Sequence, residues 1–267
     1  MRLRLAIDPQ VITSRLTRLT FDLATSLTIS FLLLLELSKL QGLIAAKRGA
    51  APTETDGRSG VAQALRAAGF VFFLGYDMGI SFIPLLARKL YEPFWGLSEE
   101  VVIGLPISTE MISAGIALLL SGHFSARHGW RKVLVAGAIS AAIGLLTGGF
   151  ATSLPMLILG RAAAGFGFGL VLMAAQIGTL GQANAGAGMA SVFAGIFSGS
   201  ICGAAAGAML AEHLSFGAAL ATGGVVSLFA ASAVLLGNDA APAGTAPAVP
   251  VAPSSGNLRL LKDPGMH

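Results

Sequence analysis

Six long apolar stretches follow one another through most of this chain, and they constrain its fold more than any other feature. Each holds the roughly 20 mostly apolar residues that an α-helix needs to cross the hydrocarbon core of a bilayer. We place them near residues 68–88, 101–121, 132–151, 155–178, 188–210 and 215–237. Because backbone groups in lipid must be paired internally, continuous runs of this kind predict helices. A membrane barrel would instead show alternating segments of about ten residues.

The composition agrees with a polytopic membrane protein and excludes several other classes. Apolar residues make up 54% of the chain and charged residues only 11%, whereas a soluble domain carries about 25% charged residues. Disordered chains are poor in apolar residues, and the single cysteine, Cys202, has no intrachain disulfide partner. The net charge is only +4, and the basic residues lie at the edges of apolar stretches. We therefore expect an all-α membrane protein that contacts the lipid bilayer and binds no nucleic acid.

The chain divides into an N-terminal helix segment, a cytoplasmic linker, a six-helix block and a flexible cytoplasmic tail, over residues 1–46, 47–66, 67–237 and 238–267. The apolar core of the first segment, Leu23 to Leu35, is too short to span a bilayer alone. Asp22, Glu36 and Lys39 interrupt the longer stretch around it. This segment either spans with those groups facing protein or lies at the membrane interface.

Lysine and arginine in the short links predict how the block is oriented in the membrane. The link near 122–132 carries Arg127, Arg131 and Lys132, and the 47–66 linker carries four basic residues. Both are predicted to be cytoplasmic. The links that carry few or no basic residues fit the outside, near 89–100, 152–154 and 211–214. Both ends of the six-helix block are therefore expected in the cytoplasm.

The link after the second stretch carries the most specific motif, Gly122-His-Phe-Ser-Ala-Arg127-His-Gly129-Trp-Arg131-Lys132. It resembles the signature loop between helices 2 and 3 of the major facilitator superfamily. The resemblance implies a gating loop made by Gly122, Arg127, Gly129, Arg131 and Lys132. The position of the family's acidic latch residue is Ala126 here. From the residues alone, the glycines allow a tight turn and each basic side chain anchors the loop in the cytoplasm.

Two glycine patterns add to this resemblance. Arg161 is followed four residues later by Gly165, as in the pattern of the family's helix 4. In the fifth stretch, glycines recur every four residues, which more loosely resembles the family's glycine-rich motif, at Gly195, Gly199, Gly203 and Gly207. The Gly-Pro step of that motif is absent, because Ala204 follows Gly203. We interpret these glycines as helix-packing positions that let backbones approach closely.

The resemblance covers roughly residues 65–262 and implies the N-terminal six-helix half of a twelve-helix transporter. The helix before it weakly resembles the last helix of a bacterial sensor module. These likenesses imply proton-coupled transport of a small solute across the inner membrane of a bacterial cell. A second six-helix half or a homodimer would complete the cavity. The alternative is a non-transporting sensor or scaffold module, or an inactive truncated transporter.

Three ionisable residues, Asp77, Glu110 and Arg161, lie deep in the predicted spans. A charge at the bilayer centre costs at least about 2.5–3.5 kcal/mol on insertion scales, so pairing is expected. In the family, helices 1 and 4 both line the central cavity, which favours a pair between Asp77 and Arg161. Such a pair is either purely stabilising or a proton site. We expect all three residues along the substrate and proton path, with Tyr76 and Gln176 able to add polar contacts.

Two prolines lie inside predicted helices. Pro84 and Pro106 remove backbone hydrogen bonds, which predicts bends in the first and second helices.

No catalytic or metal-binding pattern is present in the sequence. The four histidines lack metal-ligand spacing, and no phosphate-binding loop or serine nucleophile elbow occurs. We therefore expect no metal, no cofactor and no enzymatic activity.

Overall fold

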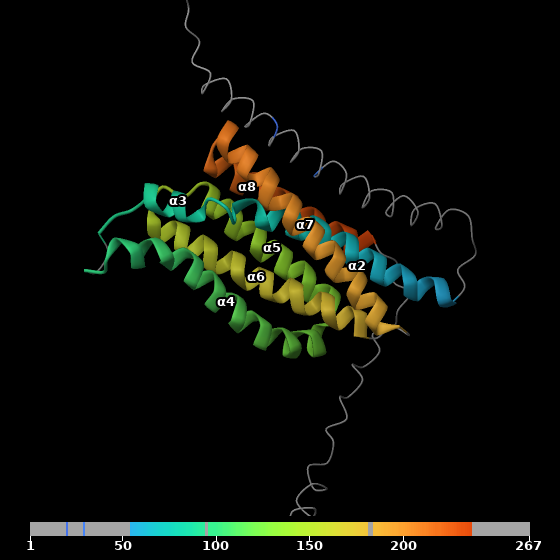
Figure 1. Ribbon diagram of the computed structural model, residues 1–267. Helices are drawn as coiled ribbons and strands as arrows, with labels where there is room; N and C mark the ends of the chain where they lie inside the picture. The colour runs from blue at the N-terminus through green and yellow to red at the C-terminus, as the bar shows by residue number, and fades with distance from the viewer. Residues whose placement is uncertain (1–19, 21–28, 30–53, 94–95, 181–183, 237–267) are drawn as a thin grey trace, which may run out of the picture.

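The computed structural model in Figure 1 describes residues 20, 29, 54–93, 96–180 and 184–236. Every regular element in these ranges is a helix. In chain order they are α2 (Glu54–Tyr76), η1 (Asp77–Gly79), α3 (Ile83–Lys89), α4 (Glu99–His128), α5 (Trp130–Gly149), α6 (Leu154–Leu180), α7 (Ala185–His213) and α8 (Phe216–Leu236).

The described helices confirm an all-α, multi-pass membrane fold. Five helical segments are long and apolar enough to cross a membrane, and a sixth, over Phe216–Ala231, is apolar but shorter. The first of the five, Val61–Lys89, combines α2, η1 and α3. Each of the six predicted stretches therefore corresponds to a helical segment.

Residues 54–66 of the predicted linker are helical, because α2 already begins at Glu54. Val61, Ala62 and Leu65 continue the packed face of this helix, and Leu65 is only 1% exposed. Leu65 lies against the region of Gly178 on α6. These apolar residues recur at helical spacing and are buried, although polar residues lie between them in the sequence. The predictions for 1–46 and 238–267 lie outside the described residues, apart from Thr20 and Ile29.

The first span is broken rather than bent. α2 ends at Tyr76, the short helix η1 and a turn follow, and α3 begins at Ile83. Pro84 stands at the start of α3 and has no N–H to donate to the carbonyl of Ile80, which removes one hydrogen bond that a continuous α-helix would form at this point. In the second span, Pro106 lies fully buried inside the unbroken α4, which follows an arc in Figure 1.

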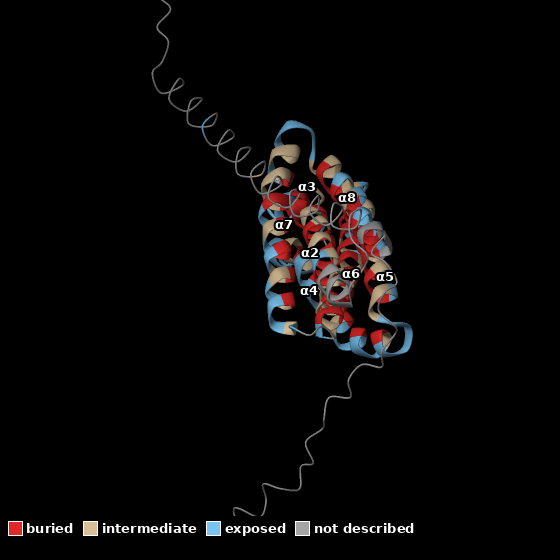
Figure 2. Cartoon of the chain, turned by 90° about the vertical axis from the view of Figure 1, so that its right-hand side faces the viewer, coloured by how far each residue is buried: buried red, intermediate tan, exposed pale blue. Residues whose placement is uncertain are grey.

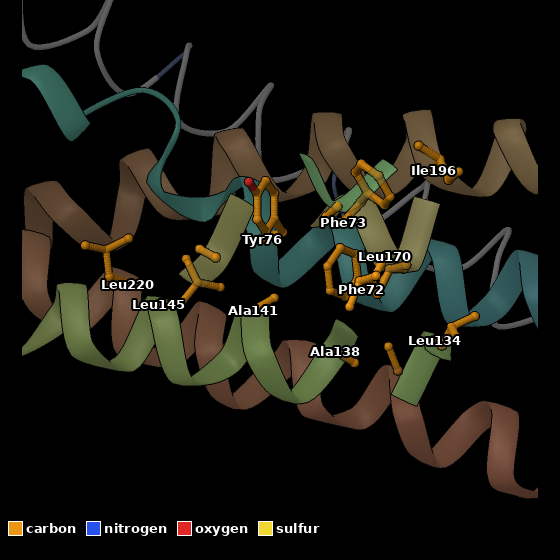
Figure 3. Packing of buried hydrophobic residues seen from close by; sticks show 14 of the residues in the cluster. Phe72, Phe73, Tyr76, Leu134, Ala138, Ala141, Leu145, Leu170, Ile196 and Leu220 are labelled. Carbon is orange, nitrogen blue, oxygen red and sulfur yellow. The ribbon is translucent and has the colours of Figure 1, made fainter. Parts of the chain in front are cut away.

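The helices form two groups of three that share one core. α6 packs between α4 and α5, α2 packs between α7 and α8, and the contact between α5 and α8 joins the groups. Figure 2 shows buried residues on the faces that the helices turn toward one another. In the centre, Phe72 and Phe73 of α2 belong to the same buried cluster as small and branched residues of α5 such as Ala138 and Leu145, which Figure 3 shows. This leaves the outer faces apolar and exposed, as lipid requires.

Glycines set how closely the helices approach. A Cβ on Gly144 of α5 would lie 2.9 Å from the backbone Cα of Ala164 on α6, so these two backbones are in direct contact. The four glycines spaced by four in α7 lie against the backbone of α2 and η1, at Gly195, Gly199, Gly203 and Gly207. The first span is thereby held against α7 from Arg66 to Met78.

Candidate functional site

A buried polar cluster lies where α2, α4 and α6 meet. Its centre is Arg161, which is 4% exposed, and Glu110, which is 3% exposed. The Arg161 Nε donates a hydrogen bond of 2.9 Å to Glu110 Oε2, and its Nη2 forms an ion pair with Oε1 of the same carboxylate. Tyr76 donates its hydroxyl proton to Glu110 Oε1. The carboxylate is therefore held by three donor atoms from two helices.

The predicted ion pair between Asp77 and Arg161 is thus wrong, because Arg161 pairs with Glu110. Gly165 explains why. It lies one helical turn after Arg161 on the same face of α6, and a Cβ there would lie 3.0 Å from the Glu110 Cα. The absence of a side chain at this position lets α4 approach α6 at the level of Glu110, which places the two charged side chains side by side.

Asp77 lies next to this pair without a direct ion pair to Arg161. It is the first residue of η1, it is 6% exposed, and its carboxyl group hydrogen-bonds with Ser200 of α7. It also interacts electrostatically with Glu110 and Arg161. The Nη1 atom of Arg161 is buried and has no hydrogen-bond partner. The cluster therefore contains two carboxyl groups and one guanidinium, and one nitrogen of that guanidinium forms no hydrogen bond.

Aromatic rings surround the cluster and keep its surroundings apolar. The Tyr76 ring stacks on Phe168 and Phe72, with centroid distances of 5.1 and 5.6 Å. The Arg161 guanidinium lies 5.7 Å from the centre of the Tyr76 ring, within reach of a cation–π interaction. Figure 3 shows Tyr76 beside Phe72 and Phe73 on α2. Hydrogen bonds and charges act more strongly here than in water, and an unpaired charge is more costly.

Serine hydroxyls tie α6 to both neighbours beside the cluster. Ser113 of α4 donates to the carbonyl of Ala162 at 2.6 Å, and Ser140 of α5 donates to the carbonyl of Ala163 at 3.0 Å. Neither these serines nor Ser200 stand out in the sequence. The available signal is their place on helix faces that also carry small residues, where a hydroxyl reaches a neighbouring backbone.

The predicted gating loop lies far along α4 from the cluster. Gly129 alone connects α4 to α5, with a φ of 83° that favours glycine. Arg127 lies in the last turn of α4, where a cation interacts favourably with the helix dipole. The Arg131 guanidinium lies 5.3 Å from the ring centre of Trp130. Gly122 has open space where a Cβ would be, and Lys132 lies in the first turn of α5.

The described residues contain no group of three histidine, cysteine, aspartate or glutamate side chains that could hold a metal ion. The geometry instead offers a dry, hydrogen-bonded set of ionisable groups inside a membrane-spanning bundle. Ionisable residues in such positions are typical of ion and substrate pathways.

Comparisons with known proteins identify the family. A family model described as the Major Facilitator Superfamily matches residues 66–265, which is 200 of the 267 residues. No match is found among curated proteins or among solved structures. The matched range contains all the described helices from the middle of α2 onward, and the whole polar cluster. The chain therefore belongs to the major facilitator superfamily, whose members are multi-pass membrane transporters.

Proposed function

We propose that the described spans form one half of a proton-coupled secondary transporter for a small solute. Its coupling centre is the cluster of Tyr76, Asp77, Glu110 and Arg161. The observation that carries this proposal is the charge count: the buried cluster holds two carboxyl groups around one guanidinium. With both carboxyl groups ionised, one negative charge stays uncompensated in an apolar environment.

An uncompensated buried charge is costly, and it is relieved by a proton or by a bound cation. A proton needs no extra volume, which suits a cluster whose members are all at least nine-tenths buried. The cluster can exchange that proton only when water reaches it from one side of the membrane. Coupling follows if the side that water reaches changes during the cycle.

The solute path of the complete transporter lies between this half and a second one. That second half is either a separate six-helix unit or another copy of this chain, in the inner membrane of a bacterial cell. The membrane helices α4 and α7 both present large exposed apolar side chains, for example Leu119 and Phe197. Such faces suit contact with a partner half as well as with lipid.

The experiment reconstitutes the full assembly in liposomes with a pH-sensitive dye inside. A panel of solutes is screened for solute-dependent proton movement. We expect Glu110→Gln and Arg161→Gln to lose at least about tenfold of the coupled flux, the effect of roughly 1.4 kcal/mol on the coupling step. Arg88→Gln, which removes the exposed ion pair with Glu99, serves as control. Unchanged coupled flux in both cluster variants would overturn the proposal.

A non-transporting membrane module is the second candidate function. Ala126 favours it, because this exposed alanine occupies the place of the acidic latch residue in the family motif. The same liposomes separate the two functions: a sensor or scaffold would show neither solute flux nor solute-dependent proton movement in the wild-type assembly.

A further inference from the structure

The end of the bundle at Gly129 carries positive charge without a matching negative charge. Arg127 lies in the last turn of α4, and Arg131 and Lys132 lie in the first turn of α5. The Arg127 and Lys132 side chains are exposed. Neither forms an ion pair within the part of the chain that the structure describes. This end therefore presents free cations to its surroundings.

The helices that meet at this end cannot supply the missing negative charge. The sequence contains no aspartate or glutamate from Met111 to Ala211, which covers all of α5 and α6 and most of α7. Residues 54–66 of α2 hold two acidic and two basic residues, and so carry no net charge. The acid of the family's loop motif is replaced by the exposed Ala126. A countercharge is therefore expected from outside these helices.

The start of α5 adds to the excess of positive charge. Its N-cap residue, Gly129, forms no side-chain capping bond, and no acidic residue stands in its first turn. The first N–H groups of α5 therefore lack a side-chain acceptor, and the positive end of the helix dipole lies beside Arg131 and Lys132. Cations are unfavourable at this end of a helix, whereas an anion is favourable. The electrostatics of the junction thus favour a bound anion.

The exposed cation of α4 stands at the end of an apolar stripe. Ile116 and Leu120 lie eleven and seven residues before Arg127, a spacing that places all three on one face of the helix. Ile116 is 50% exposed and Leu120 is 41% exposed. In a membrane, this face therefore offers an apolar surface to acyl chains directly below a cation.

α5 repeats this arrangement in the opposite direction along the chain. Ile139 and Ile143 lie seven and eleven residues after Lys132 and are 43% and 56% exposed. Trp130, whose ring lies beside Gly178 of α6, is a residue type that prefers the membrane interface. A cation at the end of an exposed apolar stripe matches a molecule with an anionic head and an apolar tail. Such a molecule is a phospholipid rather than free phosphate.

We propose that Arg127, Lys132 and the first turn of α5 bind the phosphate of an anionic phospholipid, whose acyl chains lie along the exposed stripes of α4 and α5. The lipid phosphate supplies the negative charge that is missing at Ala126. Attraction of basic residues to the head and burial of apolar surface along the chains act together. The inference is independent of the proposed proton coupling, because no residue of the buried polar cluster takes part.

The first experiment measures which lipids contact Trp130 in vesicles that contain the full chain. The sequence has two tryptophans, Trp95 and Trp130, so Trp95→Phe leaves Trp130 as the single fluorescent tryptophan. Brominated acyl chains quench tryptophan at short range, and brominated phosphatidylglycerol is compared with brominated phosphatidylcholine in phosphatidylcholine vesicles. A basic residue near the membrane surface favours an anionic lipid by about fivefold. We expect a selectivity for phosphatidylglycerol of at least that size, which decreases at high salt.

Removing the two exposed cations should abolish this selectivity. The variant combines Arg127→Gln with Lys132→Gln. Both leaflets contain the same lipids, so the result does not depend on the direction in which the chain inserts. The matched control combines Arg88→Gln with Lys89→Gln, two exposed cations at the other end of the bundle, and should keep the wild-type selectivity.

If the double variant does not fold, single variants provide the same test. Arg127→Gln alone should lose about fivefold of the selectivity, and Arg127→Lys should retain it because the charge is kept.

A second probe position tests where the lipid binds. Phe150→Trp, in a chain with Trp95→Phe and Trp130→Phe, places the tryptophan at the exposed far end of α5. We expect no selectivity for phosphatidylglycerol there. Four glutamates lie toward that end, at Glu92, Glu99, Glu100 and Glu212.

Inorganic phosphate tests whether the ligand is soluble. Added at constant ionic strength, it should leave the selectivity at Trp130 unchanged, because it has no apolar part to fill the stripes. Four results would each overturn the proposal: equal quenching by the two lipids in the wild type, unchanged selectivity in the variant that lacks both cations, equal selectivity at position 150, or loss of selectivity with inorganic phosphate. None of these measurements involves a solute or a proton gradient.

Discussion

The two faces of α6 are built alike and differ in one respect. Toward α5, Gly160 and Gly167 meet the α5 backbone, and Ser140 donates to the carbonyl of Ala163. Toward α4, glycines again meet the partner backbone and a serine again donates to a carbonyl, at Gly165, Gly169 and Ser113. Only the α4 face adds a buried ion pair, between Arg161 and Glu110.

This comparison separates packing from charge. The α5 face shows that glycines and one serine bond suffice to join two membrane helices closely. The ion pair on the α4 face is therefore an addition to a junction that packs well without it. Because buried ion pairs are weak evidence for stability, this excess favours a functional role for the pair. The following variants test that division between packing and charge.

The largest expected effect comes from removing one partner of the pair. Arg161→Ala leaves the Glu110 carboxylate buried without a countercharge, and we expect a loss of about 3–5 kcal/mol in the free energy of unfolding. SDS titration in mixed micelles measures it. Arg88→Ala, whose ion pair is exposed, should lose at most about 1 kcal/mol.

A double variant sharpens the same point. Glu110→Met combined with Arg161→Met should recover most of the stability that Arg161→Ala loses, because an apolar replacement of both partners is often neutral. A double variant as unstable as Arg161→Ala alone would show that the α4 face depends on the pair for its packing.

Tyr76→Phe should have the next largest effect. It removes the hydroxyl that donates to Glu110 while keeping the ring that stacks on Phe168. A hydrogen bond to a charged group contributes about 1.5–3 kcal/mol, so we expect a loss in that range by the same titration. The control is Tyr91→Phe, which removes a hydroxyl in the link after α3. Phe73→Leu is not a suitable control, because the Phe73 ring is also buried. Equal stability of Tyr76→Phe and wild type would contradict the bond.

Replacing a glycine of α6 by alanine should lower stability by a similar amount on the α4 face and on the α5 face. Gly165→Ala and Gly167→Ala each place a Cβ within 3.0 Å of the facing backbone, and overpacking of this kind costs about 1–3 kcal/mol. Gly115→Ala, which has open space, should be neutral or slightly stabilising because alanine favours helix. If only Gly165→Ala destabilises, the two faces are not built on the same packing.

The smallest effects belong to the serines. Ser113→Ala and Ser140→Ala each remove one hydroxyl-to-carbonyl bond between helices. Such bonds average about 0.6 kcal/mol within membranes, so we expect two small and similar losses. A much larger loss for Ser113→Ala would indicate that its bond is coupled to the charged cluster.

The sequence predicts the six spans well, because hydropathy and length are properties of each segment alone. It does not predict where a span stops being one helix. The break at Asp77–Phe82 lies inside an apolar stretch whose hydropathy is continuous, and only Pro84 indicates it. The helix over residues 54–66 is hard to predict for the opposite reason. The polar residues before Arg66 lie on a helix whose apolar residues, including Leu65, are buried by other spans.

The site residues were identified in the sequence because a charge in lipid needs an explanation. The sequence does not predict which of these residues pair, because the pairing depends on which helices come into contact. A register signal was nevertheless present. Gly165 marks the close-contact face of α6 one turn from Arg161, and Pro106, Glu110 and Ala114 share one face of α4 at a spacing of four. Two faces that each combine small residues with one charge favour a direct pair.

The single residue between α4 and α5 also determines how far a tilt of α4 displaces the residues along that helix. Gly129 has φ 83° and ψ 145°, a conformation that is rarely open to residues other than glycine. α4 and α5 therefore share one pivot at Gly129, and α6 packs against both helices. At 1.5 Å per residue, a tilt of α4 by about 5° around this pivot moves the Glu110 backbone by roughly 2.5 Å and the start of the helix by roughly 4 Å. A small rotation about Gly129 is thus sufficient to separate Glu110 from Arg161.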